Sequence, residues 1–422
     1  MSFTFAISRT KRNIVRDVAR LARLCLNTSW LEFSSVGQAS RLSMAFGCQS
    51  ILVLAGRLTG ETPVPPKIFQ TKPRKTHATR LALTTALVVG GLCASAGAQD
   101  ETPVAKEVST GPTFVEITPE SRAAVEKGLA FLAASQEADG SFAANGMGKN
   151  VGITGLACLA FMADGHLPGR GKYGANVQRG LEYVLQNVHE NGLIAAGTSH
   201  GPMYGHGFAT LFLGEIYGMT DDPRVREALI KAVRLIVASQ NHEGGWRYQP
   251  VPMDADVSVT ICQIMGLRSA RDAGLAVPRE TIQNAISYVR KCQNQGDGGF
   301  RYMLNSGGSA FPRSAAGVAS LYYAGVYEDK ALERGLNYLH RNWRPGAGRG
   351  GHFYYGQYYA SQAMFLAGGK HWADWFPNIR GELIKQQQDD GGWASSYGTS
   401  YGSAMALLIL QVPNRFLPIF QR

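Results

Sequence analysis

Two kinds of apolar pattern alternate along the chain. In the first, apolar residues recur every three or four positions, as at Val125, Leu129 and Leu132. This spacing puts one apolar stripe on a helix, so these stretches predict amphipathic helices with one buried face. The same spacing returns at residues 225–236, 282–289 and 332–339.

The second pattern is apolar on nearly every position over about one helix length. Helices that are apolar on all faces are buried helices. We therefore expect a set of inner helices, each following an amphipathic outer helix. They are predicted at residues 153–162, 208–216, 257–267, 315–323, 360–366 and 404–410.

A short signature joins each outer helix to its inner helix. It consists of a Gln, an acidic residue, one or two glycines and an aromatic residue. Glycine allows the positive φ that ends a helix, Gln can pair with backbone groups at helix ends, and the aromatic ring supplies buried area. The four clear copies start at Gln136, Gln240, Gln293 and Gln387 and include the aromatic residues Phe142, Trp246, Phe300 and Trp393.

Looser copies span Gln186 to Leu193 and His340 to Phe353, so the repeat has a period of roughly fifty residues and six units. Repeats of this kind stack, and an open stack needs polar capping units at both ends. The sequence shows no such cap. We therefore predict an all-α fold, a single closed α/α toroid of about six helix pairs over residues 118–422, with Trp246, Phe300 and Trp393 buried where units meet.

The segment before the repeats has the features of a leader. Residues 72–98 contain a basic stretch, a short apolar stretch from Leu81 to Leu92 and the site Ala96-Gly97-Ala98, which together predict a secretory signal cleaved near Ala98. The preceding residues 1–71 are a doubtful extension, with a plain basic tail as the alternative, and 99–117 is a linker. We expect an exported protein, periplasmic or extracellular, without a transmembrane anchor in the mature chain.

The positive net charge lies in that leader. Residues 1–98 hold 13 Lys and Arg against 3 Asp and Glu, whereas residues 99–422 hold 29 against 28. A nearly neutral mature domain argues against nucleic acid as a partner. The three cysteines that remain, Cys158, Cys262 and Cys292, are odd in number and have no short spacing, so they predict packing residues rather than disulfides.

The Gln-x-x-(Asp/Glu)-Gly-Gly-(Trp/Phe) copies resemble the QW repeats of squalene–hopene cyclases and the related repeats of protein prenyltransferase beta subunits. The likeness covers about residues 119–412. It implies a terpenoid-cyclase-like toroid and an isoprenoid-like apolar small molecule as ligand. The zinc site of the prenyltransferases needs an Asp-x-Cys pair, which this chain lacks. We therefore expect no metal and no cofactor.

The resemblance also marks a candidate catalytic pair. Asp254 and Asp256 lie just before the third inner helix and resemble the Asp-x-Asp-Asp motif of class II terpene cyclases, in which the middle Asp donates a proton to a polyene. That residue is Asp256 here, and Val257 replaces the last Asp. The alternative is that Asp256 caps the inner helix, as Asp does before a helical run. A cap would lower the pKa of its carboxyl.

Other polar and aromatic residues also fall where inner helices begin. In a toroid all inner helices start at one end, so these side chains should surround one mouth, where helix N-termini favour anionic groups. Packing is the alternative role for the tyrosines, and a structural one for the histidine. The candidate ligand-cavity residues are Tyr204, His206, Arg313, His352, Tyr354, Tyr358 and Tyr401.

Three functions remain open. The first is an isoprenoid or polyene cyclase-type enzyme, an isomerase or lyase, with Asp256 as proton donor in a deep aromatic cavity. The second is a non-catalytic toroid that binds a lipid or a protein, which a cavity filled with side chains would favour. The third is a polysaccharide lyase or hydrolase working in an open groove with Arg, His and Tyr side chains.

The leader prediction has a direct test. N-terminal sequencing of the native protein should begin near Gln99 because the signal is removed after Ala98. Recovery of peptides from residues 1–30 in the mature protein would contradict both the cleavage site and the doubt about the extension.

Overall fold

The computed structural model describes residues 116–144, 148–196, 201–344 and 352–421, which belong to one compact unit. The predicted extension and signal peptide, and the linker up to residue 115, lie outside the described residues. The described part is helical. Its only strands are β1 (Ala143–Ala144) and β2 (Gly148–Lys149), a two-residue antiparallel pair.

Twelve α-helices in the described residues alternate between an outer and an inner layer. The outer helices are α3 (Pro119–Ser135), α5 (Gly174–Gln186), α7 (Pro223–Ala238), α9 (Arg279–Cys292), α11 (Lys330–Asn342) and α13 (Gly369–Gln386). The inner helices are α4 (Val151–Met162), α6 (Met203–Ile216), α8 (Val257–Asp272), α10 (Phe311–Tyr323), α12 (Phe353–Ala367) and α14 (Thr399–Leu410).

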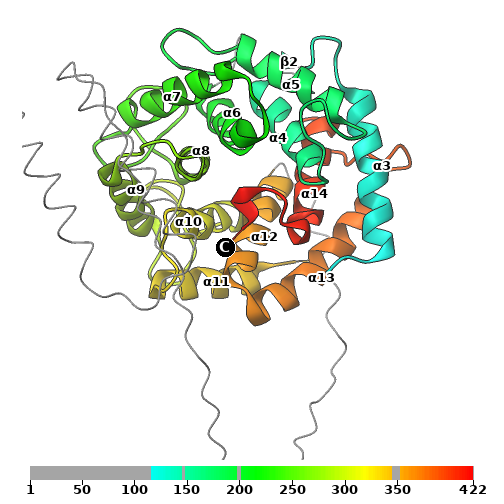
Figure 1. Ribbon diagram of the computed structural model, residues 1–422. Helices are drawn as coiled ribbons and strands as arrows, with labels where there is room; N and C mark the ends of the chain where they lie inside the picture. The colour runs from blue at the N-terminus through cyan, green and yellow to red at the C-terminus, as the bar shows by residue number, and fades with distance from the viewer. Residues whose placement is uncertain (1–115, 145–147, 197–200, 345–351, 422) are drawn as a thin grey trace, which may run out of the picture. The chain divides into compact units, whose positions relative to one another are not determined.

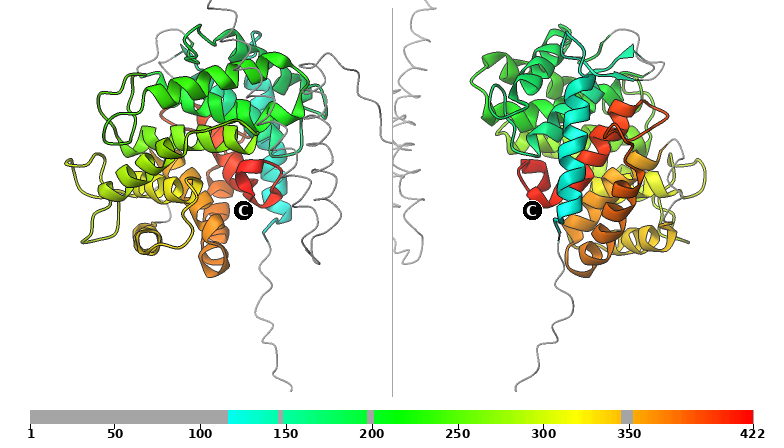
Figure 2. Two further views of the ribbon diagram at one scale, coloured as in Figure 1. Left: turned by 60° about the vertical axis from the view of Figure 1, so that its left-hand side comes forward. Right: turned by 90° about the vertical axis from the view of Figure 1, so that its right-hand side faces the viewer.

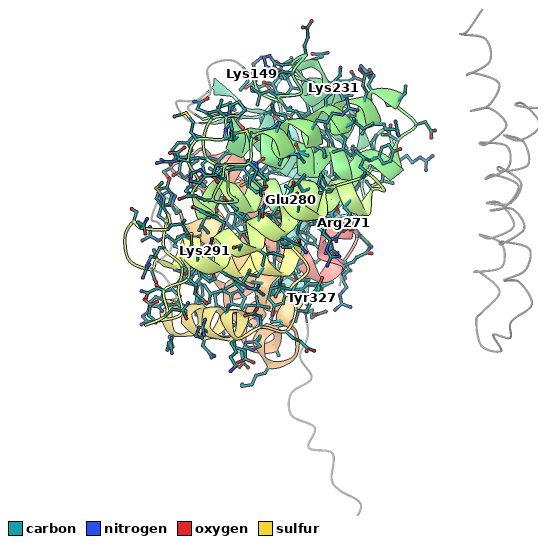
Figure 3. All side chains as sticks on the ribbon, turned by 90° about the vertical axis from the view of Figure 1, so that its left-hand side faces the viewer. Lys149, Lys231, Arg271, Glu280, Lys291 and Tyr327 are labelled. Carbon is teal, nitrogen blue, oxygen red and sulfur yellow. The ribbon has the colours of Figure 1, made fainter. Side chains whose placement is uncertain are left out.

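The inner helices form a closed ring. Each packs against the next, and α14 packs against α4, so the last unit meets the first (Figure 1). The outer helices carry charged residues on the face that points away from the inner helices, as Figure 3 shows for Lys231, Glu280 and Lys291. The predicted all-α closed toroid of six helix pairs is confirmed.

Five of the six inner helices begin earlier than the apolar pattern predicted, whereas α8 begins at the predicted Val257. Helix α6 starts at Met203 rather than at 208, and α12 starts at Phe353 rather than at 360. Their first turns carry histidine, glutamine and tyrosines, which a count of apolar positions misses. Those turns lie at the mouth of the ring, where polar groups can face solvent.

The Gln of the signature joins one unit to the next. The side-chain amide of Gln240 donates one hydrogen bond to the carbonyl of Gly244 in its own turn and another to the carbonyl of Thr281 in α9. Both acceptors are backbone groups, so the joint depends little on the surrounding side chains. The same pair of bonds runs from Gln136 to Gly140 and Asn176, from Gln293 to Gly298 and Ala331, and from Gln387 to Gly391 and Ala124.

The glycine in each turn is required for two reasons. Gly244 has a φ of +99°, and a Cβ atom there would lie 2.3 Å from the carbonyl oxygen of Asn284 in the next outer helix. Both the left-handed backbone and the close approach exclude a side chain. The turn therefore rests directly on the backbone of the neighbouring unit.

The aromatic residue fills the space beneath that joint. Trp246 and Trp393 are almost completely buried, and each indole N–H donates to a carbonyl of its own preceding outer helix, that of Ile236 or Leu383. Trp393 also packs on Gly128 of the first unit. Phe300 is likewise buried, as the sequence predicted for all three.

Two units depart from the signature. In the turn after α5, Val188 occupies the position of the signature Gln. This alignment follows from the backbone: the N–H of His189 donates to the carbonyl four residues on, as the N–H groups of Glu137 and Asn241 do in their turns. The expected copy at Gln186 was therefore two residues out of register. In the fifth unit, Trp343 follows α11 with the same φ and ψ as Gln293 after α9, and it contacts the ring of Trp375.

The chain after α14 crosses one end of the ring. It forms two short 3₁₀ turns, η3 (Val412–Asn414) and η4 (Pro418–Phe420), at the end where inner helices finish. Figure 2 shows these turns on one side of the ring and the loops that precede the inner helices on the other. None of the helices in the described ranges is both long and apolar enough to cross a membrane.

Trp393 offers a test of the joints. We expect Trp393→Ala to lower the free energy of unfolding by roughly 3–5 kcal/mol because it leaves a cavity between the last unit and the first. Urea denaturation measures the loss. Tyr327→Ala, at a residue about half exposed, is the control and should change stability little. A loss below about 1 kcal/mol for Trp393→Ala would show that the ring does not fasten the units.

Candidate functional site

The candidate site lies at the mouth of the ring, where inner helices begin. Asp256 is the N-cap of α8 and its side chain is fully buried. Its Oδ1 accepts a hydrogen bond from the N–H of Val259 at 2.9 Å, and its Oδ2 accepts one from the hydroxyl of Tyr302 at 3.2 Å. The carboxyl of Asp256 thus caps α8 and also binds a tyrosine hydroxyl at the mouth.

Burial raises the pKa of Asp256 to about 6, because removing a carboxylate from water outweighs the opposing bonds from Val259 and Tyr302. The capping bond from Val259 does lower the pKa, as expected of a cap, but burial has the larger effect. Because the pKa of Asp256 is higher in the folded than in the unfolded protein, the folded protein binds this proton more tightly. The contribution of Asp256 to stability is therefore present at low pH and is lost as the pH rises through about 6.

Capping alone does not call for an acid at this position. The N-caps of the other five inner helices are Asn150, Pro202, Ala310, His352 and Gly398. Asn150 bonds the N–H groups of Gly152 and Ile153 without any charge. Asp256 is the one carboxylic acid among the N-caps of the six inner helices, whereas Asp222 and Asp329 cap outer helices.

Arg247 joins Asp256 to Asp254. One terminal nitrogen of its guanidinium binds the carboxylate of Asp254, and Nε lies 3.7 Å from Oδ2 of Asp256. Asp254 is half exposed and lies on the solvent side of the pair. The structure thus brings the two predicted aspartates to one guanidinium.

Two tyrosines complete this group. The hydroxyls of Tyr248 and Tyr302 are hydrogen-bonded to each other, and the guanidinium of Arg247 lies over both rings. Arg247, Tyr248 and Tyr302 were not among the site residues predicted from the sequence. The position of Arg247, directly after the signature residue Trp246 and seven residues before Asp254, was the available signal.

The mouth tyrosines are hydrogen-bond donors at neutral pH. Burial raises the pKa of Tyr204, Tyr302 and Tyr401 far above the ordinary value for a phenol. A tyrosine acts as a base only as a phenolate, so these residues are poorly suited to abstract a proton. Asp256 is the group in this cluster whose pKa lies near neutrality.

Tyrosines from α12 fill the centre of the ring. The hydroxyl of Tyr355 donates to the carbonyl of Ser258 across the ring, Tyr359 contacts the sulfur of Cys262, and Tyr358 packs edge-on to Phe208 of the opposite helix α6. All three tyrosines are buried. These side chains therefore occupy the interior of the ring beneath the mouth.

His206 has a structural environment. It is fully buried, and its Nδ1 accepts the N–H of Ile194 in the preceding turn. Burial lowers its pKa to about 4, so the ring is neutral. In four other units, the backbone N–H of the signature aromatic residue donates to a hydroxyl of the following inner helix in the same way. The accepting residues are Thr154, Thr260, Ser314 and Ser403.

The remaining predicted cavity residues occupy different depths. Tyr204 is partly buried beside the ring of Tyr248, while Tyr354 and Tyr358 lie within the packed interior. Arg313 donates to the carbonyl of Gly308, and the exposed His352 contacts the hydroxyl of Tyr397, whose ring packs on Tyr401. Within the described ranges no three His, Cys, Asp or Glu side chains converge as metal ligands.

No protein-family model and no curated protein sequence matches the chain. Solved structures do. A cellobiose 2-epimerase from Spirochaeta thermophila aligns with a TM-score of 0.56 at 13% identity, over 73% of this chain and 98% of that one. An inactive α-1,6-mannanase variant from a Salegentibacter species, in complex with α-1,6-mannotriose, aligns at 0.54 and 10%, over 70% and 99%.

A family 76 glycoside hydrolase from a Bacteroides thetaiotaomicron strain aligns at 0.52 and 10%, over 70% of this chain and 78% of that one. At these identities the likenesses establish the toroid fold. The predicted resemblance to squalene–hopene cyclases and prenyltransferase beta subunits was wrong, because the matching toroids are sugar-processing proteins. The polyene cyclase activity and the isoprenoid ligand inferred from that resemblance lose their support, and tyrosines of α12 occupy the centre of the ring.

The hydrogen bond from Tyr302 to Asp256 can be tested through the pKa of Asp256. Its hydroxyl bond lowers the pKa of Asp256, so Tyr302→Phe should raise that pKa above about 6. Carbon-13 NMR titration of the Asp256 carboxyl measures the change. Tyr397→Phe removes a mouth hydroxyl that contacts His352 instead and should leave the titration unchanged. An unaltered Asp256 titration in Tyr302→Phe would contradict the assigned contact.

Proposed function

We propose that the chain is a carbohydrate-active enzyme of the hydrolase type, with its site at the mouth of the ring. The observation that carries the proposal is the buried carboxyl of Asp256, whose pKa of about 6 lets it hold a proton near neutral pH. The sugar-processing toroids with the same fold support a carbohydrate substrate. The mannanase was inactivated by replacing two consecutive aspartates with asparagine, which fits a chemistry that depends on carboxyl groups.

The two aspartates are suited to different steps. Asp256 protonates the glycosidic oxygen as the bond from that oxygen to the anomeric carbon breaks. Asp254, exposed and paired with Arg247, takes a proton from the water that attacks the same carbon. Glycoside hydrolysis uses such a pair of one protonated and one ionised carboxyl. Tyr302 and Tyr248 donate hydrogen bonds and orient these groups.

The lyase alternative fits less well. A lyase needs a base to abstract a proton beside the carboxylate of an acidic sugar, and the raised pKa values of the mouth tyrosines oppose that role. His206, the other base considered, is neutral but lies buried against its own turn. The groups at the mouth, a protonated Asp256 and an ionised Asp254, therefore fit hydrolysis better than a lyase reaction.

A non-catalytic binding toroid is the second candidate, and one observation favours it. The tyrosines of α12 fill the ring centre, as expected of a protein that binds a ligand over its mouth rather than inside it. Under this alternative Arg247, Tyr248 and Tyr204 would contact a saccharide or a protein without turning it over.

Activity measurements separate the two candidates. The purified protein should release reducing ends from at least one substrate in a panel of α-1,6-mannan, cellobiose and related oligosaccharides. Asp256→Asn should lower kcat by about 10²–10⁴, because Asn retains the cap but cannot donate a proton. The rate should fall as the pH rises through about 6, where Asp256 loses its proton.

Asp222→Asn is the matched control. Asp222 caps the outer helix α7 by bonding the N–H of Arg224, so it repeats the change from Asp to Asn at a cap far from the mouth. It should retain full activity. Saccharide binding by calorimetry without turnover, unchanged in Asp256→Asn, would favour the non-catalytic candidate and contradict the hydrolase.

A further inference from the structure

The segment after α14 closes the end of the ring opposite the mouth. The side chain of Gln411 donates to the carbonyl of Ala160, and that of Asn414 donates to the carbonyl of Ala163, both at the end of α4. Leu417, Ile419 and Phe420 are buried against the inner helices. We call residues 411–421 the end segment.

Glu215, near the end of α6, holds the middle of the end segment. Its side chain is almost fully buried, and its Oε2 accepts the backbone N–H of Ile419 at 3.0 Å. On the other side of Ile419, the carbonyl lies 3.4 Å from the hydroxyl of Tyr323. The one proton of that hydroxyl goes to the side-chain oxygen of Gln362, so Ile419 is held chiefly through its N–H, by Glu215.

The hydrogen bonds around Glu215 fit a protonated carboxyl. The hydroxyl of Ser269 lies 2.7 Å from Oε1 of Glu215 and 3.2 Å from the carbonyl of Leu211. A hydroxyl has one proton. If Ser269 donates it to Leu211, Oε1 of Glu215 supplies the proton for the shorter bond, and every group is satisfied.

The ionisable groups near Glu215 leave it without a cation of its own. Arg268 on α8 is paired with Asp272 on the same helix, and their effects on Glu215 oppose each other. Tyr323 on α10 and Tyr358 on α12 are protonated, since burial raises the pKa of each. Burial accordingly raises the pKa of Glu215 to about 7.

We propose that the end segment is a latch that closes this end of the ring while Glu215 is neutral and opens when Glu215 ionises. Ionisation would leave a carboxylate buried without a cationic partner, and release of Ile419 lets water reach it. This latch is separate from the mouth chemistry and does not depend on the proposed activity.

The sign follows from linkage. Glu215 has a pKa of about 7 with the segment closed and an ordinary value near 4.3 when solvated. The closed state therefore binds the proton more tightly. Its stabilisation by Glu215 is complete below about pH 4.3, falls roughly tenfold for each pH unit above that, and is fully lost once the pH has risen through about 7.

Hydrogen–deuterium exchange of the intact protein tests the latch. The measured quantity is the protection of the Ile419, Phe420 and Gln421 amides, corrected for the intrinsic dependence of exchange on pH. We expect protection in the wild-type protein to fall roughly tenfold between pH 6 and pH 8.5, because the closed state loses the proton of Glu215 in that range. Protection that is equal at both pH values would overturn the proposal, and this arm needs no variant.

Glu215→Gln separates ionisation from other effects of pH. The Gln amide can donate to Ser269 and its oxygen can accept from Ile419, so the variant imitates the neutral acid at every pH. It should keep protection constant between pH 6 and pH 8.5. The control is Glu280→Gln on the exposed face of α9 (Figure 3), which should lose protection as the wild type does. A Glu215→Gln protein that loses protection in the same way would contradict the latch.

Discussion

The ring depends on one repeated hydrogen-bonded joint between a side-chain amide and two backbone carbonyls. Each Gln ties its own turn to the next outer helix, and the glycine four or five residues later lets the two backbones meet. A single amide with two N–H donors suffices, because both partners are carbonyls with a free lone pair. The bond from Gln387 to Ala124 makes the last unit the neighbour of the first, and closure follows.

Closure also decides where chemistry can occur. Six inner helices that meet side by side leave a narrow centre, and the tyrosines of α12 reach across it to α6 and α8. The end segment covers the far end through Ile419. The mouth is at the other end, where the N-cap residues of the six inner helices differ from one another. Asp256 combines a cap with a titrating carboxyl at that position.

Much of the architecture could be predicted from the sequence because it is periodic. The apolar stripes and the Gln, Gly and aromatic positions specify the helix pairs and their order, and the burial of Trp246 and Trp393 follows from their place in the turn. The site was harder to predict. Asp254 and Asp256 stood out by spacing, and Arg247 precedes them in the same loop. Tyr302 approaches from the loop of the next unit, and no local pattern links residues that meet only after the units pack. The raised pKa of Asp256 likewise depends on burial, which the capping rule does not contain.

The seam between the last unit and the first has a consequence for chain connectivity. The joint at Gln387 has the same bonds as the joints within the chain, so the ring has no physical beginning. Near the seam, Glu116 lies at the start of the described helices and pairs with Arg415, 3.5 Å away in the end segment. The two ends of the folded region are therefore adjacent, and this is the arrangement in which circular permutation preserves a fold. A chain that begins at a different one of the six units should therefore build the same ring.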